Sequence, residues 1–156
     1  MHRKIVTLLS GGVESLVVAA EASNQANNDR YGVFIDYGQM AREKEAEAAH
    51  RIAKRYGMYL EKVDLTLPFL NDHAMCAGGI MYAHHLSGVL GVKNLTARAS
   101  ADRSHVIPLR NVIFLSIAAS FAMSISADEL MVGFDYRPNL PSATADKSPA
   151  FVNAMR

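Results

Sequence analysis

The chain has 156 residues, of which half are hydrophobic and a fifth are charged, a composition that excludes disordered, collagen-like and fibrous proteins. Sixteen basic residues against 15 acidic ones leave a formal net charge of +1, so no broad positive field is available to hold a nucleic-acid backbone. Cys76 is the only cysteine, which excludes an internal disulfide and suits a reducing compartment, so we expect a cytoplasmic protein.

Short apolar runs alternate with helical patterns along most of the chain. The first run is apolar on both faces and ends at a serine and two glycines, as is typical of a central parallel strand. In chain order we expect a strand at 5–9, a helix at 13–23, a strand at 31–35, an amphipathic helix at 39–56, a strand at 58–63, a helix at 111–126, a strand at 129–134 and a short helix in the last eight residues. This alternation predicts an open parallel sheet in a Rossmann-like, three-layer α/β sandwich.

The segment at about 65–107 has no sustained period and holds four of the six histidines. Long irregular segments of this kind are often functional loops, so we expect residues 1–156 to form one domain that carries such a loop. No membrane segment is expected, because the run at 5–9 is too short for a signal-peptide core and the run at 112–127 is shorter than the ~20 residues of a spanning helix.

The turn after the first expected strand reads Ser10-Gly11-Gly12-Val13-Glu14-Ser15. Glycines let the backbone approach a ligand closely, and the N-terminus of the following helix favours phosphate through its unpaired N–H groups and its dipole. No lysine follows the glycines, so the turn is not a Walker-type P-loop. The alternative interpretation is a tight strand-to-helix turn in which Ser10 is an ordinary N-cap.

This turn resembles the Ser-Gly-Gly-x-Asp-Ser signature of the PP-loop ATP pyrophosphatases. Two further segments, Phe34-Ile35-Asp36-Tyr37-Gly38-Gln39 and residues 106–116 (VIPLRNVIFLS), resemble signatures of the 7-cyano-7-deazaguanine synthases of queuosine biosynthesis. The three motifs occur in the family's order. The resemblance implies an adenine nucleotide alpha hydrolase-like fold.

It also implies a ligase that uses ATP and magnesium to adenylate 7-carboxy-7-deazaguanine, releases pyrophosphate, and amidates the product with ammonia. Arg110 and Asp36 would act in catalysis, and Glu14 and Asp36 would hold magnesium. The implied nucleotide-binding residues are Ser10, Gly11, Gly12, Val13, Glu14, Ser15, Tyr37, Arg110 and Asn111, and the implied substrate-binding residues are Asp135, Asp146 and Phe151.

Simpler roles remain open for two of these residues. Asn111 is a good helix cap, and Asp36 is a common turn residue. The sequence also departs from the family pattern: Glu14 replaces aspartate, and Lys147-Ser148 stand where the substrate loop has cysteine and arginine. These departures leave a second hypothesis, a non-catalytic or partner-dependent homologue that binds a nucleotide or deazapurine. A twofold homodimer is expected in either case.

The family's four-cysteine zinc site is not expected here, because Cys76 is the only cysteine. His73, His84 and His85 lie near Cys76 in the sequence and offer nitrogen ligands. Their irregular spacing favours solvated or substrate-facing histidines over a metal site.

Overall fold

The computed structural model describes residues 2–68, 107, 109–135 and 145–155. The described residues fall into two compact units, one formed from stretches within 1–35, 43–63 and 109–156, the other from stretches within 36–42 and 64–108. A single domain over 1–156 therefore stays a prediction, and most of the expected loop at 65–107 lies outside the described residues.

Every strand and helix expected within the described residues is present. The elements are β1 (Arg3–Leu8), α1 (Val13–Asn24), β2 (Asn28–Asp36), α2 (Arg42–Arg55), β3 (Tyr59–Asp64), α5 (Arg110–Ser124), β4 (Glu129–Met131), the 3₁₀ turn η4 (Ala145–Lys147) and α6 (Pro149–Ala154). β2 begins three residues earlier than expected, because residues 28–30 pair with residues 3–5 of β1. The side chain of Arg30 donates to the Tyr56 carbonyl at 2.8 Å. No helix in the described part of the chain reaches the length and apolarity that crossing a bilayer requires.

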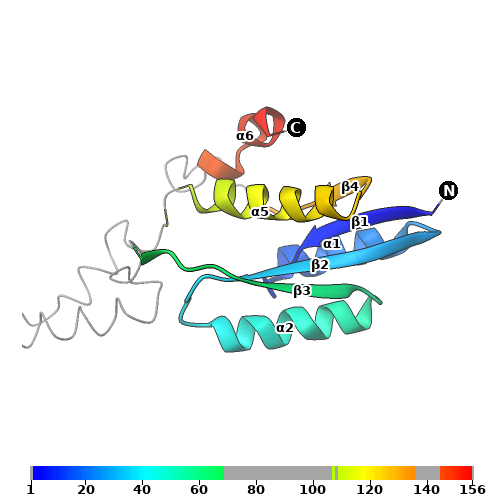
Figure 1. The fold of residues 1–156 in the computed structure, drawn as a ribbon, viewed down its shortest axis with the longest axis horizontal. Helices are drawn as coiled ribbons and strands as arrows, with labels where there is room; N and C mark the ends of the chain where they lie inside the picture. The colour runs from blue at the N-terminus through cyan, green and yellow to red at the C-terminus, as the bar shows by residue number, and fades with distance from the viewer. Residues whose placement is uncertain (1, 69–106, 108, 136–144, 156) are drawn as a thin grey trace, which may run out of the picture. The chain divides into compact units, whose positions relative to one another are not determined.

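The sheet has four parallel strands in the order β3-β2-β1-β4 (Figure 1). β1 is central: it pairs with β2 from Arg3↔Asn28 to Leu8↔Val33 and with β4 over Ile5–Thr7. The predicted open parallel α/β sheet is confirmed. Because all strands run in the same direction, the turns that follow them gather at one edge, where ligands bind in such folds.

Helices cover both faces of the sheet. Ile5, Leu9 and Phe34 are buried in one cluster with small residues of α1 and α2. Tyr31 has the opposite parity along β2 and contacts the ring of Phe121 in α5, with centroids 6.3 Å apart. Since alternate residues of a strand point to opposite faces, α5 covers the face opposite α1 and α2. The core members from the two helices are Ala19, Ala22, Ala49, Ile52 and Ala53.

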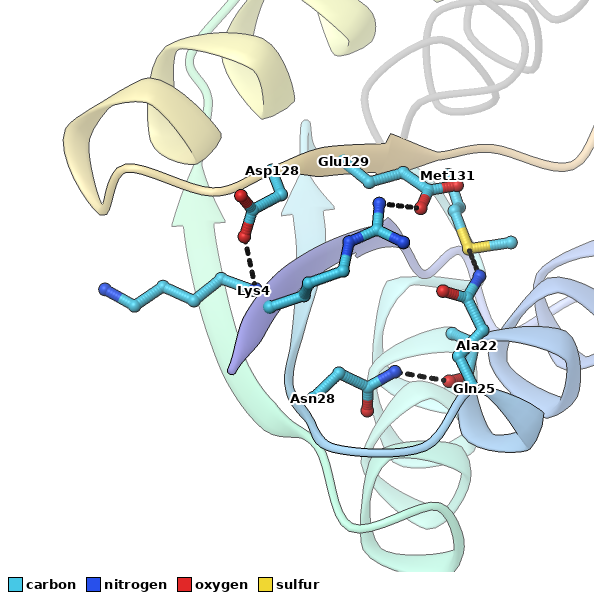
Figure 2. Close-up of polar contacts among 8 residues, drawn as sticks. Lys4, Ala22, Gln25, Asn28, Asp128, Glu129 and Met131 are labelled. Carbon is cyan, nitrogen blue, oxygen red and sulfur yellow. Dashed lines mark hydrogen bonds and ion pairs between the residues drawn. The ribbon is translucent and has the colours of Figure 1, made fainter. Parts of the chain in front are cut away.

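Polar contacts hold the amino edge of the sheet together (Figure 2). The backbone N–H of Lys4 donates to the carboxylate of Asp128 at 2.8 Å, and Asn28 donates to the Ala22 carbonyl at 3.2 Å. The Lys4 ammonium also donates to the carbonyl of Ile125, just after α5. The C-terminus of α5 therefore lies at the amino edge, which places the start of α5 at the carboxyl edge.

Candidate functional site

The turn Ser10–Ser15 leads from the end of β1 directly into α1. Gly12 is the N-cap of α1, and because glycine has no side chain it makes no side-chain cap hydrogen bond. The Ser10 hydroxyl accepts the N–H of Gly12 at 3.3 Å, and the Ser15 hydroxyl donates to the Gly12 carbonyl at 2.8 Å. The alternative interpretation of Ser10 as the N-cap is therefore wrong. The serines shape the turn, and the N-cap position itself offers no side chain to α1.

The two glycines of the turn are required for different reasons. Gly11 has φ +80°, and a β-carbon on it would lie 2.6 Å from the carbonyl oxygen of Glu45 in α2. A β-carbon on Gly12 would meet only side-chain oxygens of the turn itself, Glu14 Oε2 at 3.2 Å and Ser10 Oγ at 3.4 Å. Gly11 thus lets the turn pack on α2, whereas Gly12 borders the polar side of the turn.

A third glycine, Gly133, packs on the start of α1. It lies two residues after β4, and a β-carbon there would be 2.7 Å from the carbonyl oxygen of Glu14 and 2.9 Å from Val18. The end of β4 is thereby held against the turn at the start of α1. Sequence reasoning missed Gly133, although a glycine directly after a strand is itself a signal of close backbone approach.

A groove of about 410 Å³ runs between α1 and α2 beside the turn. Val13, Leu16 and Ile52 contribute apolar walls, while Arg51 and Arg55 line it from α2. Its remaining lining residues are Gly11, Gly12 and Ala48. Arg51 also pairs with Glu47 one turn earlier in α2, at 3.0 Å. The groove therefore brings positive charge close to the N-terminus of α1.

The start of α5 is capped from a distant part of the chain. Its N-cap, Leu109, has a left-handed backbone with φ 54° and makes no side-chain cap bond. Instead the Asp146 carboxylate accepts the N–H of Asn111 at 3.0 Å, and the Asn111 side-chain amide donates to the Asp146 carbonyl at 3.3 Å. The interpretation of Asn111 as the helix cap is wrong, because Asp146 takes that role. Arg110 places its guanidinium carbon 5.7 Å from the ring centroid of Phe114.

Asp36 and Tyr37 belong to the second unit and form a turn at the end of β2. The Asp36 carboxylate accepts the N–H of Gly38 at 3.1 Å, and the Tyr37 N–H donates to the side chain of Gln39 at 2.9 Å. Gly38 has φ +82°, which suits this turn. Asp36 is thus a half-buried turn residue rather than a solvated one. Its catalytic and magnesium-binding roles stay predictions.

Phe151 and Asp135 come from segments that meet through their aromatic residues. The rings of Phe151 and Phe134 are in edge contact, with centroids 6.5 Å apart, and Asp135 is the next, half-buried residue. The N–H of Phe151 donates to the Ser148 hydroxyl at 3.1 Å, which caps α6. The structure therefore brings Phe151 close to the segment of Asp135, and joins Asp146 to Asn111.

Among the described residues no three His, Cys, Asp or Glu side chains converge to hold a metal ion. His73, Cys76, His84 and His85 lie outside the described residues. The predicted magnesium site at Glu14 and Asp36 stays a prediction.

Known proteins resemble this chain over most of its length. Residues 4–156 match the family described as "Queuosine biosynthesis protein QueC". A 7-cyano-7-deazaguanine synthase of Bdellovibrio bacteriovorus is 33% identical over 135 residues, which cover 86% of this chain and 58% of the relative. One of Thermoplasma volcanium is 32% identical over 158 residues, covering 99% of this chain and 59% of the relative.

Among solved structures, a predicted tRNA methyltransferase subunit of Methanocaldococcus jannaschii has a TM-score of 0.43 and 13% identity, over 98% of this chain and 62% of that chain. The chain thus spans less than two thirds of the length of these relatives. The family match includes all three sequence motifs, the first of which is the turn at the start of α1. The chain belongs to the family of the queuosine biosynthesis protein QueC.

Proposed function

We propose that this chain is the ATP-binding part of a ligase that converts 7-carboxy-7-deazaguanine to the corresponding nitrile. The carboxylate attacks the α-phosphate of ATP, which forms an acyl adenylate and releases pyrophosphate. Ammonia then displaces AMP to give the amide. The amide oxygen then attacks the α-phosphate of a second ATP and releases a second pyrophosphate, and loss of AMP and a proton leaves the nitrile. The relatives of this chain that are 7-cyano-7-deazaguanine synthases support this substrate class.

The observation that carries the proposal is the contrast between two helix starts at the carboxyl edge. The start of α5 receives the carboxylate of Asp146. The start of α1 has Gly12 as its N-cap, which has no side chain to offer, and the helix is entered through Gly11 and Gly12. Because helix N-termini bind anions, the first N–H groups of α1 are suited to phosphoryl oxygens that come from outside the chain.

The remaining residues of the turn support the same role. Gly12 keeps the space beside Ser10 Oγ and Glu14 Oε2 free of a β-carbon, so phosphoryl oxygens can approach the backbone. Ser10 adds a hydroxyl at this place. Arg110, at the start of α5, carries a planar cation that suits a phosphate or the substrate carboxylate. Catalysis would then consist mainly of positioning and charge neutralisation.

Magnesium fits the chemistry of the turn. Glu14 is half-buried, and its carboxylate lies beside Gly12, where it can supply one oxygen ligand next to the phosphates. Asp36 has one carboxylate oxygen in its own turn with Gly38. When bound, the ion would neutralise charge on the phosphates of ATP.

The test is pyrophosphate release from ATP, measured with and without 7-carboxy-7-deazaguanine and ammonium. We expect release that depends on the carboxylate substrate. Gly12→Arg should abolish it by filling the space beside the turn. Val17→Arg is the matched control, because it adds the same charge to an exposed position of α1 one turn further on. Equal loss in both variants, or no substrate-dependent release in the unaltered chain, would contradict the ligase.

A nucleotide-binding homologue without turnover is the second candidate. It is favoured by Ser148, which stands where the family's substrate loop has arginine and is used as the cap of α6. This candidate predicts calorimetric binding of ATP with no pyrophosphate release for any deazapurine carboxylate. The same two assays therefore separate the candidates.

A further inference from the structure

Asn111 and Asp146 form a two-point contact between segments 35 residues apart. The Asn111 N–H donates to the Asp146 carboxylate at 3.0 Å, and the Asn111 side chain donates to the Asp146 carbonyl at 3.3 Å. Asn111 is only 6% exposed, so its polar groups depend on this partner. The contact joins the segment 106–116 to the segment 144–151, the two stretches in which the sequence places Arg110 and Phe151.

The contact fixes more than one residue of the C-terminal segment. Asp146 lies in η4, and Ser148 caps α6 immediately after it. Phe151 of α6 then rests against Phe134, beyond β4. Residues 145–154 are therefore attached at two places, to the start of α5 through Asp146 and to the end of β4 through Phe151.

On the α5 side the contact acts next to Arg110. A carboxylate that accepts an N–H in the first turn of a helix makes a charge-assisted bond and complements the helix dipole. The residue that receives this bond, Asn111, directly follows Arg110, whose guanidinium packs over Phe114 in the next turn. The backbone from which Arg110 projects is thus held by Asp146.

We infer that Asp146 is a positioning residue that sets the start of α5, and with it Arg110, and that it acts through Asn111 rather than by contact with the substrate. This inference rests on the proposed function for its catalytic consequence. It differs from the role that the family resemblance implies for Asp146, a direct ligand of the deazapurine. The two roles predict different effects of Asp146→Asn, which replaces the carboxylate with a neutral amide.

The experiment compares Asp146→Ala, Asp146→Asn, Asn111→Ala and the double variant Asp146→Ala/Asn111→Ala. Hydrogen exchange of the amides at 111–114 reports the cap, and kcat/KM for the carboxylate substrate reports Arg110. Asp146→Ala should lower protection of the Asn111 amide about 5- to 30-fold, the equivalent of the ~1–2 kcal/mol of a lost helix cap. Asp146→Asn should restore most of it, since an amide oxygen still accepts the N–H.

Catalysis should follow the same pattern. We expect Asp146→Ala and Asn111→Ala each to lower kcat/KM at least tenfold, the double variant to lower it no further than the worse single one, and Asp146→Asn to recover most of the loss. If Asp146→Asn is as damaging as Asp146→Ala to kcat/KM, or if exchange at 111–114 does not respond to Asp146→Ala, the inference is wrong.

The control is Asp128→Ala, which removes a carboxylate that accepts a backbone N–H at the opposite edge of the sheet. It should leave exchange at 111–114 and kcat/KM for the substrate unchanged. Failure of the proposed function would look different from failure of the inference. In that case the unaltered chain would release no pyrophosphate, while the exchange measurements would still decide whether Asp146 holds the start of α5.

Discussion

Gly11 lies so close to Glu45 that a β-carbon on the glycine would be 2.6 Å from the glutamate's carbonyl oxygen. The contact joins the turn after β1 to the backbone of α2, which does not move aside as a flexible side chain would. Gly133 makes a similar approach to the carbonyl of Glu14. Two backbone contacts therefore hold the turn in place.

Gly11→Ala should destabilise the fold strongly. The left-handed backbone alone costs a non-glycine residue about 1–2 kcal/mol, and the contact with Glu45 adds an overpacking cost of about 1–3 kcal/mol. Gly38→Ala is the matched control, because Gly38 has φ +82° and no atom of the described residues lies within 4 Å of its β-carbon position. Urea unfolding measures both. Equal losses would mean that α2 yields to the new methyl group.

Gly12→Ala should instead leave stability nearly unchanged and weaken ATP binding. Gly12 has φ −82° and ψ 171°, an extended conformation that alanine adopts without strain. Its methyl group would enter the space between Glu14 and Ser10, where phosphoryl oxygens are proposed to bind. We expect the free energy of unfolding to change by less than about 0.5 kcal/mol and the Kd for ATP, measured by calorimetry, to rise at least tenfold. Unaltered ATP affinity would place the phosphates elsewhere.

Glu14→Gln should change ATP affinity in opposite directions with and without magnesium. Without magnesium, the carboxylate repels the phosphates, so its loss should tighten ATP binding about fivefold, or ~1 kcal/mol for a solvent-screened pair of charges. With magnesium, loss of an oxygen ligand should weaken binding instead. The measurement is ATP affinity in EDTA and in excess magnesium. Glu14→Asp is the control, because it keeps the charge and should not tighten ATP binding in EDTA. If Glu14→Gln changes ATP affinity in the same direction in EDTA and in magnesium, Glu14 is not a magnesium ligand.

Ser148→Ala should loosen α6 without affecting the turn at α1. Its hydroxyl accepts the N–H of Phe151 in a helix of only six residues, so its loss should cost about 1 kcal/mol. Hydrogen exchange of residues 151–154 measures the effect. Ser124→Ala provides the comparison, since that exposed hydroxyl donates to a carbonyl at the end of α5 and caps no N–H group. Similar exchange in both variants would show that Pro149 alone starts α6.

The sequence by itself determined the order of strands and helices, because apolar alternation and glycine turns are properties of neighbouring residues. It also located the glycine turn at Ser10–Ser15, whose phosphate-binding role stays a prediction. It did not determine which helix start is available to a ligand. Asparagine is a common helix cap, so the sequence suggests this role for Asn111. Only the fold brings Asp146 to the first turn of α5.

The tertiary structure likewise decided why each glycine is needed. Gly11 and Gly12 are adjacent and look equivalent in the sequence, yet one faces the backbone of α2 and the other the polar side of the turn. The sequence did not predict the contact of Gly133 with Glu14, because the two residues are distant along the chain. The same holds for the hydrogen bond from Arg30 to the carbonyl of Tyr56. Local patterns specify backbone conformation, whereas close approach and capping depend on contacts between segments that only the folded chain brings together.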